Sequence, residues 1–249
     1  MNSTVPVLSS AISAAASRAL VMNNPGAVSN QAEDQAYINA LLPEGAVFAI
    51  WAPIYVGLLG LTVAQAWPSL SEDLKPARPW LAATPPLHAA WYAMVTGEQG
   101  SLASMLVQTV MSGVARQLHG SLDGLNRPDA DMVRRSLRAG AGLYVGWLDA
   151  ANLPGWSSAA LESGWDGETP PPQVWGTVGV VAGAIRGEVL SEKLDNPWVE
   201  VAFVNALAGI AVRQWKQDRP VVAAAAGVSA VISGARVAKK LWTRWRARK

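Results

Sequence analysis

The chain has 249 residues, of which 51% are hydrophobic and 15% are charged, and its net charge is +2. Soluble proteins carry about 25% charged residues, so this composition favours a membrane protein, and so small a net charge does not indicate nucleic acid as a partner. The absence of cysteine excludes disulfides, thiolate metal sites and cysteine nucleophiles.

The first two predicted membrane helices lie in residues 1–22 and 45–70. Residues 1–22 are rich in Ala and Ser and contain no acid, and because their start also lacks positive charge we predict a weak membrane helix rather than a targeting sequence. Residues 45–70 carry no charge and exceed the roughly 20 apolar residues that cross a bilayer. Pro53 predicts a kink, and the helix is expected to end at Trp67.

An aromatic wall is predicted on this second helix. Phe48, Trp51 and Tyr55 follow one another at offsets of three and four, which places their rings on one side. The helix therefore combines a membrane span with a surface suited to a flat ligand.

Residues 79–97 form the third predicted span, interrupted at Pro85 and Pro86. Three of its residues share a face at offsets of four and three: Thr84, His88 and Trp91. The fourth span covers residues 101–115, and a basic loop that ends in a short interfacial turn is expected over residues 120–138.

The fifth span is predicted over residues 139–161, with Tyr144 and Trp147 about one turn apart and a break at Pro154. Three shorter apolar runs follow, each near the lower limit of about 17 residues for a span. They cover residues 174–190, 197–212 and 220–235. The sequence thus predicts an all-α integral membrane bundle of about eight transmembrane helices.

The distribution of Lys and Arg predicts an orientation. With eight spans, nearly all basic residues fall on one side, including the loop at residues 120–138 and the tail that begins at Arg236. The positive-inside rule then places both termini in the cytoplasm of a bacterium, or in the stroma of a plastid. We expect an integral protein of a bacterial inner membrane or a plastid membrane.

Three motifs occur in order along the chain: FAIWAPIY at residues 48–55, LHAAW at 87–91 and LYVGW at 143–147. In this order they resemble the second, third and fifth helices of the TspO/MBR family, the tryptophan-rich sensory or translocator proteins. The resemblance covers about residues 5–161. The chain departs from the family pattern at His88, where many members have Asn.

The resemblance implies a five-helix core in residues 1–161 and additional C-terminal helices with a basic tail in residues 162–249, as in long variants of the family. It also implies a pocket for tetrapyrroles or sterols, lined by Trp51, Trp91, Tyr144 and Trp147. From the residues alone, these rings and Tyr55 either stack on a flat macrocycle or serve as helix-packing and interface aromatics.

His88 lies in mid-span on the Trp91 face, and a neutral imidazole can be the axial ligand of haem iron or chlorophyll magnesium. The alternative is a hydrogen bond to a neighbouring helix. The cofactor-binding candidates are Trp51, Tyr55, His88, Trp91, Tyr144 and Trp147, with His88 as the candidate metal ligand of a tetrapyrrole (haem, porphyrin or chlorophyll).

Ionisable residues within the spans are costly in lipid and indicate function or pairing. Asp149 is the strongest candidate of this kind, and its expected partner is Asn152 or a donor on another helix. Arg186, Glu188 and Glu200 are expected to snorkel. The tail from Arg236 is expected to anchor at anionic lipid headgroups rather than bind RNA. Gly-x-x-x-Gly at residues 142–146 and 179–183 predicts close helix contacts.

Three functions remain open at this point. The first is a membrane protein that binds a hydrophobic ligand, a tetrapyrrole or a sterol, as carrier, sensor or chaperone. The second is an accessory subunit of a larger membrane complex, such as a photosynthetic one, that binds pigments or lipids and contacts other membrane subunits or a second copy. The third is a porphyrin-degrading enzyme, but the sequence offers no catalytic group, so we expect no enzyme. From the small net charge we also expect no nucleic-acid partner.

Overall fold

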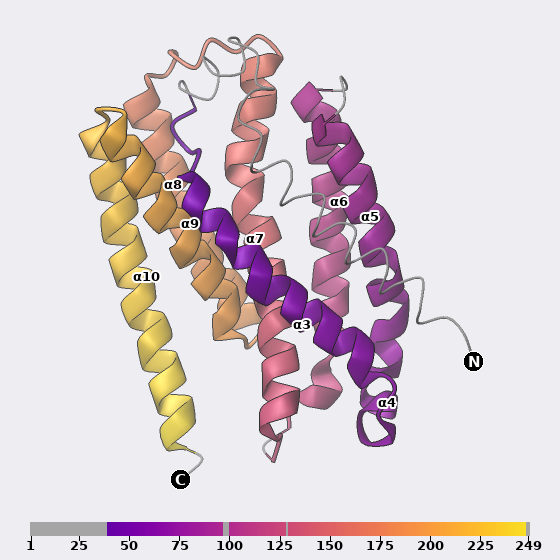
Figure 1. Cartoon of the computed structure of the whole chain (residues 1–249). Helices are drawn as coiled ribbons and strands as arrows, with labels where there is room; N and C mark the ends of the chain where they lie inside the picture. Colours follow the sequence, from indigo (N-terminus) through magenta and orange to yellow (C-terminus); the bar gives the residue numbers. More distant parts are fainter. Residues whose placement is uncertain (1–38, 97–99, 128, 248–249) are drawn as a thin grey trace.

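The computed structural model describes residues 39–96, 100–127 and 129–247, and in these ranges the chain is helical without strands. Seven long helices form a bundle, with short helix α4 at one end (Figure 1). The helices are α3 (Trp51–Ala64), α4 (Pro68–Leu74), α5 (Arg78–Thr96), α6 (Gly100–Gly120), α7 (Met132–Glu162), α8 (Pro172–Lys193), α9 (Pro197–Lys216) and α10 (Pro220–Arg246). The seven long helices, without α4, correspond to the second to eighth predicted spans, and the predicted span in residues 1–22 lies outside the described ranges.

The aromatic segment forms two helices of different pitch. A 3₁₀ helix, η2 (Gly45–Ile50), leads directly into α3, so Pro53 lies in the first turn of α3. Proline is tolerated there because the first turn of a helix needs no intrahelical N–H donors. The segment predicted as one helix thus changes pitch at Ile50, just before Pro53, and α3 ends at Ala64, before Trp67.

Two helices continue through prolines at which the sequence predicted breaks. α5 contains Pro85 and Pro86, and α7 contains Pro154, without interruption. Each interior proline removes one backbone hydrogen bond, but α6 packs against α5, and α3, α6, α8 and α9 pack against α7. Tertiary packing outweighs the local preference, so both predicted interruptions were wrong.

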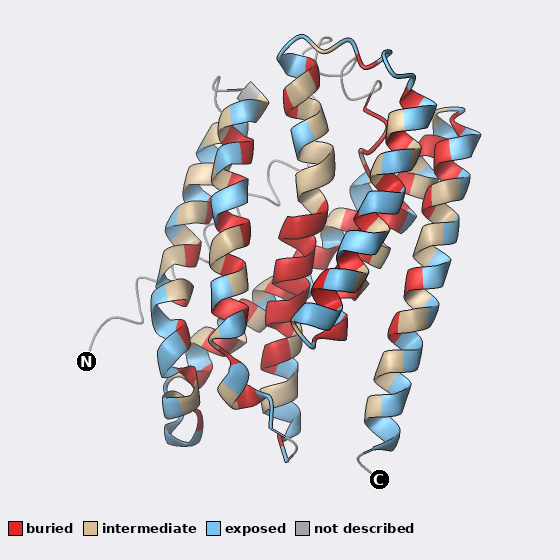
Figure 2. Cartoon of the chain, turned by 180° about the vertical axis from the view of Figure 1, so that it is seen from behind, coloured by how far each residue is buried: buried red, intermediate tan, exposed pale blue. Residues whose placement is uncertain are grey.

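Helix α7 begins earlier than predicted because Asp131 caps it. The Asp131 carboxylate accepts a hydrogen bond of 2.8 Å from the backbone N–H of Arg134, which also holds the pKa of that carboxyl below its usual range. Residues 132–138, expected in a loop and an interfacial turn, are therefore helical. Further along, every residue from Gly140 to Ala150 is buried, which makes α7 the central helix of the bundle (Figure 2).

Glycines allow α3 and α9 to approach α7 closely. A Cβ on Gly140 would lie 2.7 Å from the Cα of Gly57 on α3, far inside van der Waals contact. Gly142 and Gly146 face α9 in the same way, where added Cβ atoms would collide with Asn196 and with the backbone of Val199. The close contact predicted from Gly-x-x-x-Gly is thus present between α7 and α9.

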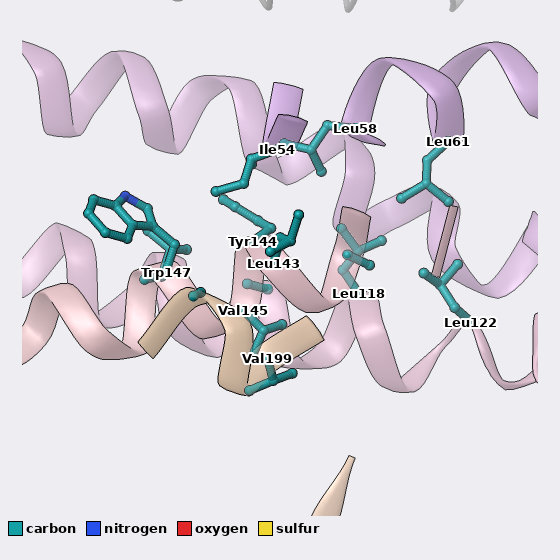
Figure 3. Close-up of a cluster of buried hydrophobic side chains, with 14 of the residues drawn as sticks. Ile54, Leu58, Leu61, Leu118, Leu122, Leu143, Tyr144, Val145, Trp147 and Val199 are labelled. Atoms are coloured by element: carbon teal, nitrogen blue, oxygen red, sulfur yellow. The ribbon is translucent and has the colours of Figure 1, made fainter. Parts of the chain in front are cut away.

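The largest apolar core forms where α3, α6, α7 and α9 meet (Figure 3). Helix α3 contributes Ile54, Leu58 and Leu61, and the central helix contributes Leu143 and Val145. The remaining residues labelled in the close-up are Leu118, Leu122, Tyr144, Trp147 and Val199. Because α9 contributes to this core, a helix from the C-terminal third of the chain packs against those that carry the motifs.

Apolar side chains also cover much of the outer surface. On α8 a stripe of five residues, each between 44% and 63% exposed, follows helical spacing: Val174, Val178, Val181, Ile185 and Val189. Such a continuous apolar face is unusual on a soluble monomer and fits contact with lipid or another protein. By length and hydropathy, two segments in the described ranges, Gly45–Ala64 and Pro220–Arg246, are apolar enough to cross a membrane.

The glycine contact predicts the effect of a single added methyl group. We expect Gly140→Ala to destabilise the protein by about 1–3 kcal/mol, because α3 must move away from α7. This corresponds to a fall of about 2–10 °C in the melting temperature measured in mild detergent.

Gly113→Ala is the matched control, because a Cβ at Gly113 on α6 would meet no atom within 4 Å. Replacing glycine by alanine in an open helix position raises stability by up to about 1 kcal/mol. A Gly140→Ala protein as stable as Gly113→Ala would contradict the tight contact.

Candidate functional site

Five of the predicted site residues form one continuous cluster of rings from α3, α5 and α7. Trp51 stacks on Tyr55 with ring centroids 5.2 Å apart, and it meets the edges of His88 at 5.7 Å and Trp147 at 6.3 Å. His88 in turn stacks on Tyr144 at 5.6 Å. Rings from the three sequence motifs therefore lie in contact inside the bundle.

A hydrogen bond within α5 orients His88. Its Nδ1 lies 2.9 Å from the backbone carbonyl of Thr84, one turn earlier on α5. Since a carbonyl accepts, Nδ1 carries the proton in the neutral imidazole, and Nε2 carries the lone pair. The ring is buried between Trp51 and Tyr144.

An apolar cavity of about 300 Å³ lies beside this cluster, in the half of the bundle that contains the N-terminus of α6 and the C-terminal half of α7. Four aromatic residues line it: Phe48, Trp51, Trp91 and Trp147. Phe48 meets Trp147 edge-on at 5.4 Å. Helices α6 and α9 complete the wall with Met105, Met111, Ala206 and Ile210.

One polar side chain in this cavity has an unused donor. Gln108 of α6 is 6% exposed and lines the cavity, and its Nε2 has no hydrogen-bond partner. An unsatisfied buried amide costs about 1–3 kcal/mol, so such groups are rare and need a reason. A ligand oxygen in the cavity would provide one.

The predicted site residues thus divide into two groups. Trp51, Trp91 and Trp147 line the cavity, whereas the other three are not among its lining residues and belong to the ring cluster behind it: Tyr55, His88 and Tyr144. Sequence reasoning did not select Gln108 as a binding residue, although a glutamine in the middle of a predicted span was a usable signal. It also missed the contribution of α9, because α9 carries no aromatic motif for the cavity.

The cavity fits part of a tetrapyrrole, but His88 does not present its imidazole there. Broad indole faces and an amide donor suit a flat macrocycle with polar substituents. An axial ligand must face the plane of the macrocycle, whereas His88 packs between Trp51 and Tyr144. Across the three described ranges, no group of three or more metal-binding side chains occurs. The assignment of His88 to a metal stays a sequence-based prediction.

Comparison with known families gives a match over nearly the whole chain. The family of TSPO-like proteins matches residues 3–238. The chain belongs to the TSPO-like family. No curated protein and no solved structure matches significantly. The match extends beyond residue 161, so it includes α8, α9 and most of α10 of this TSPO-like protein, and membership indicates an integral membrane protein.

A buried carboxylate connects three helices of the TSPO-like protein. Asp149 on α7 accepts hydrogen bonds of 2.7 and 2.9 Å from Arg116 of α6 on one oxygen. On its other oxygen it accepts bonds of 3.0 and 3.2 Å from Arg186 of α8. The expected partner of Asp149 on another helix is therefore present twice, and Arg186 pairs rather than snorkels.

A second ionic network joins the last three helices. Glu200 on α9 is fully buried, and it accepts hydrogen bonds from Arg236 at 3.2 Å and Lys240 at 3.1 Å, both on α10. Arg236 also pairs with Glu188 of α8 at 3.0 Å. These two basic residues, expected in a lipid anchor, turn inward, because a buried carboxylate needs paired cations.

Removing the Asp149 charge should weaken the bundle. In Asp149→Asn the two guanidinium groups lose their shared partner and repel each other, and both remain partly exposed, so we expect a loss of about 1–3 kcal/mol. The melting temperature in detergent should fall by about 2–10 °C. Asp218→Asn is the control, because Asp218 is exposed in the turn before α10, and equal stability of the two variants would exclude this role.

Proposed function

We propose that this TSPO-like protein binds a hydrophobic ligand of the tetrapyrrole or sterol class in the cavity between α3, α5, α6, α7 and α9, as carrier, sensor or chaperone. The observation that carries the proposal is the Gln108 amide, buried in an apolar cavity with an unpaired Nε2 donor. A ligand with an oxygen atom at this point satisfies the amide, while its apolar body covers the tryptophan rings.

The shape of the cavity supports a flat, rigid ligand. Trp51, Trp91 and Trp147 come from three different helices and enclose one space, so a planar or fused-ring molecule contacts several rings at once. The volume of about 300 Å³ is at the lower end of the range for small-molecule sites. It therefore encloses part of a tetrapyrrole, and the rest of the ligand extends through the mouth.

The chemistry of the cavity wall supports binding rather than transformation of the ligand. The polar residues that line it are Ser101, Ser104, Gln108 and Ser158. Ser104 donates a hydrogen bond of 2.8 Å to a backbone carbonyl, and Ser101 donates to Glu162. These residues supply hydrogen bonds to a ligand, and we assign no catalytic step to them.

The Gln108 donor gives a two-part prediction. We expect Gln108→Leu to weaken binding of protoporphyrin IX or cholesterol to the purified protein by about 2–10-fold, because one hydrogen bond to the ligand is lost. The ligand-free variant should be more stable than the wild type, because an unsatisfied buried amide has been removed. Fluorescence titration and thermal unfolding in mild detergent measure the two effects.

Thr109→Val is the matched control, because Thr109 is exposed on the outer face of α6 and its hydroxyl donates to the carbonyl of Met105. It should bind ligand like the wild type. Unchanged affinity of Gln108→Leu for both ligands would remove the main support for this site.

The tryptophan wall gives a separate prediction. Trp91→Ala should weaken protoporphyrin binding by about tenfold or more, since a stacked ring contributes about 0.5–1.5 kcal/mol beyond its buried area. Trp215→Ala, which removes an indole that is 70% exposed on α9, should leave affinity unchanged. Equal affinities of these two variants would mean that the probe binds to the outer surface.

A further inference from the structure

A second cavity, of about 500 Å³, lies at the opposite end of the bundle from the cavity lined by the tryptophans, which we call the aromatic cavity. It is enclosed by the N-terminal turns of α7, the start of α9 and the last turns of α10. In Figure 1, the yellow end of α10 and the lower part of α7 extend beyond the turn that joins α8 and α9. We call this space the basic cavity.

The wall of the basic cavity is strongly positive. Four arginines line it: Arg127, Arg135, Arg138 and Arg244. Within the described part of the chain, no acidic residue lines this cavity. Two of these have carboxylate partners just outside, since Arg127 pairs with Asp73 and Arg244 pairs with Asp195. Arg135 and Arg138 have no carboxylate within ion-pair distance in the residues that the structure describes.

Arg138 is a buried cation held by neutral groups. It is 7% exposed, and its Nη1 and Nη2 donate hydrogen bonds to the carbonyls of Asp195 at 2.8 Å and Leu194 at 3.0 Å. Its Nε, also buried, has no hydrogen-bond partner. Burial of a charge is costly unless it is paired, so an anion in this cavity would stabilise the folded protein.

Arg135 and Arg138 both line the basic cavity from α7. They are three residues apart on α7, which places them on the same face of the helix. Guanidinium groups bind phosphate oxygens in a forked, two-point geometry with more specificity than ammonium groups do. The pair therefore favours a phosphate group.

The rim of the cavity is apolar, which distinguishes a lipid from a soluble anion. Trp198 is 37% exposed and Trp245 is 46% exposed, and both line the cavity together with Met132. Tryptophan is enriched at the level of lipid headgroups, and basic pockets between membrane helices bind anionic headgroups. We propose that the basic cavity binds the phosphate of an anionic glycerophospholipid, with the indole rings against the start of its acyl chains.

The test compares charge-removing variants of the full chain in neutral detergent. Thermal unfolding is followed while phosphatidylglycerol, phosphatidylcholine or inorganic phosphate is added. Phosphatidylglycerol should stabilise the wild type at lower concentration than phosphatidylcholine, and inorganic phosphate should have little effect. Arg135→Gln should require about tenfold more phosphatidylglycerol, because a hydrogen-bonded charge contact is lost.

Lys239→Gln is the matched control, because it removes one positive charge from an exposed position in the C-terminal part of α10, the part that lines the basic cavity. It should respond to phosphatidylglycerol like the wild type. Equal responses of Arg135→Gln and Lys239→Gln would overturn the proposal in favour of general surface attraction. Stabilisation by inorganic phosphate as strong as that by phosphatidylglycerol would overturn the assignment to a lipid. Arg135→Gln leaves the Arg138 hydrogen bonds to the α8–α9 turn in place, so the variant should fold.

Discussion

The close approach of α3 and α9 to the central helix α7 is the contact on which the rest of the structure depends. Gly57 and Gly140 let the backbones of α3 and α7 touch, and Gly142 and Gly146 do the same for α7 and α9. In lipid, helices gain little from the hydrophobic effect, so association relies on close packing and hydrogen bonds. The glycines in the middle of α7 allow the close packing.

The same helix takes part in one of the two ionic networks and lines both cavities. Asp149 binds arginines from α6 and α8, which attaches two further helices to α7. Trp147 faces the aromatic cavity, and Arg138, on the N-terminal side of the glycines, lines the basic cavity. The proposed ligand site and the proposed lipid site thus lie in different halves of the bundle, and α7 contributes to both.

Sequence reasoning predicted the helical class and the seven long helices of the described ranges, because apolar runs of sufficient length and aromatic residues at offsets of three and four indicate helices and their faces. That rings from separate helices share one region was implied by the family resemblance. Sequence reasoning failed at Pro85, Pro86 and Pro154, where packing from neighbouring helices keeps the helix intact against a local preference. Partners across helices were also hidden: no periodicity indicates that Arg236 turns inward to Glu200, or that Gln108 faces the tryptophans. The first predicted span, in residues 1–22, lies outside the described residues and stays a prediction. The binding roles of all six candidates also stay predictions: Trp51, Tyr55, His88, Trp91, Tyr144 and Trp147.

Photo-crosslinking of the protein in liposomes with a diazirine-bearing porphyrin tests the ligand site most directly. The label should appear on peptides from α3, the C-terminal end of α5, the first half of α6 and the second half of α7, and unlabelled porphyrin should suppress it. Labelling confined to the outward valine stripe of α8 or to α10, without competition by unlabelled porphyrin, would contradict the account.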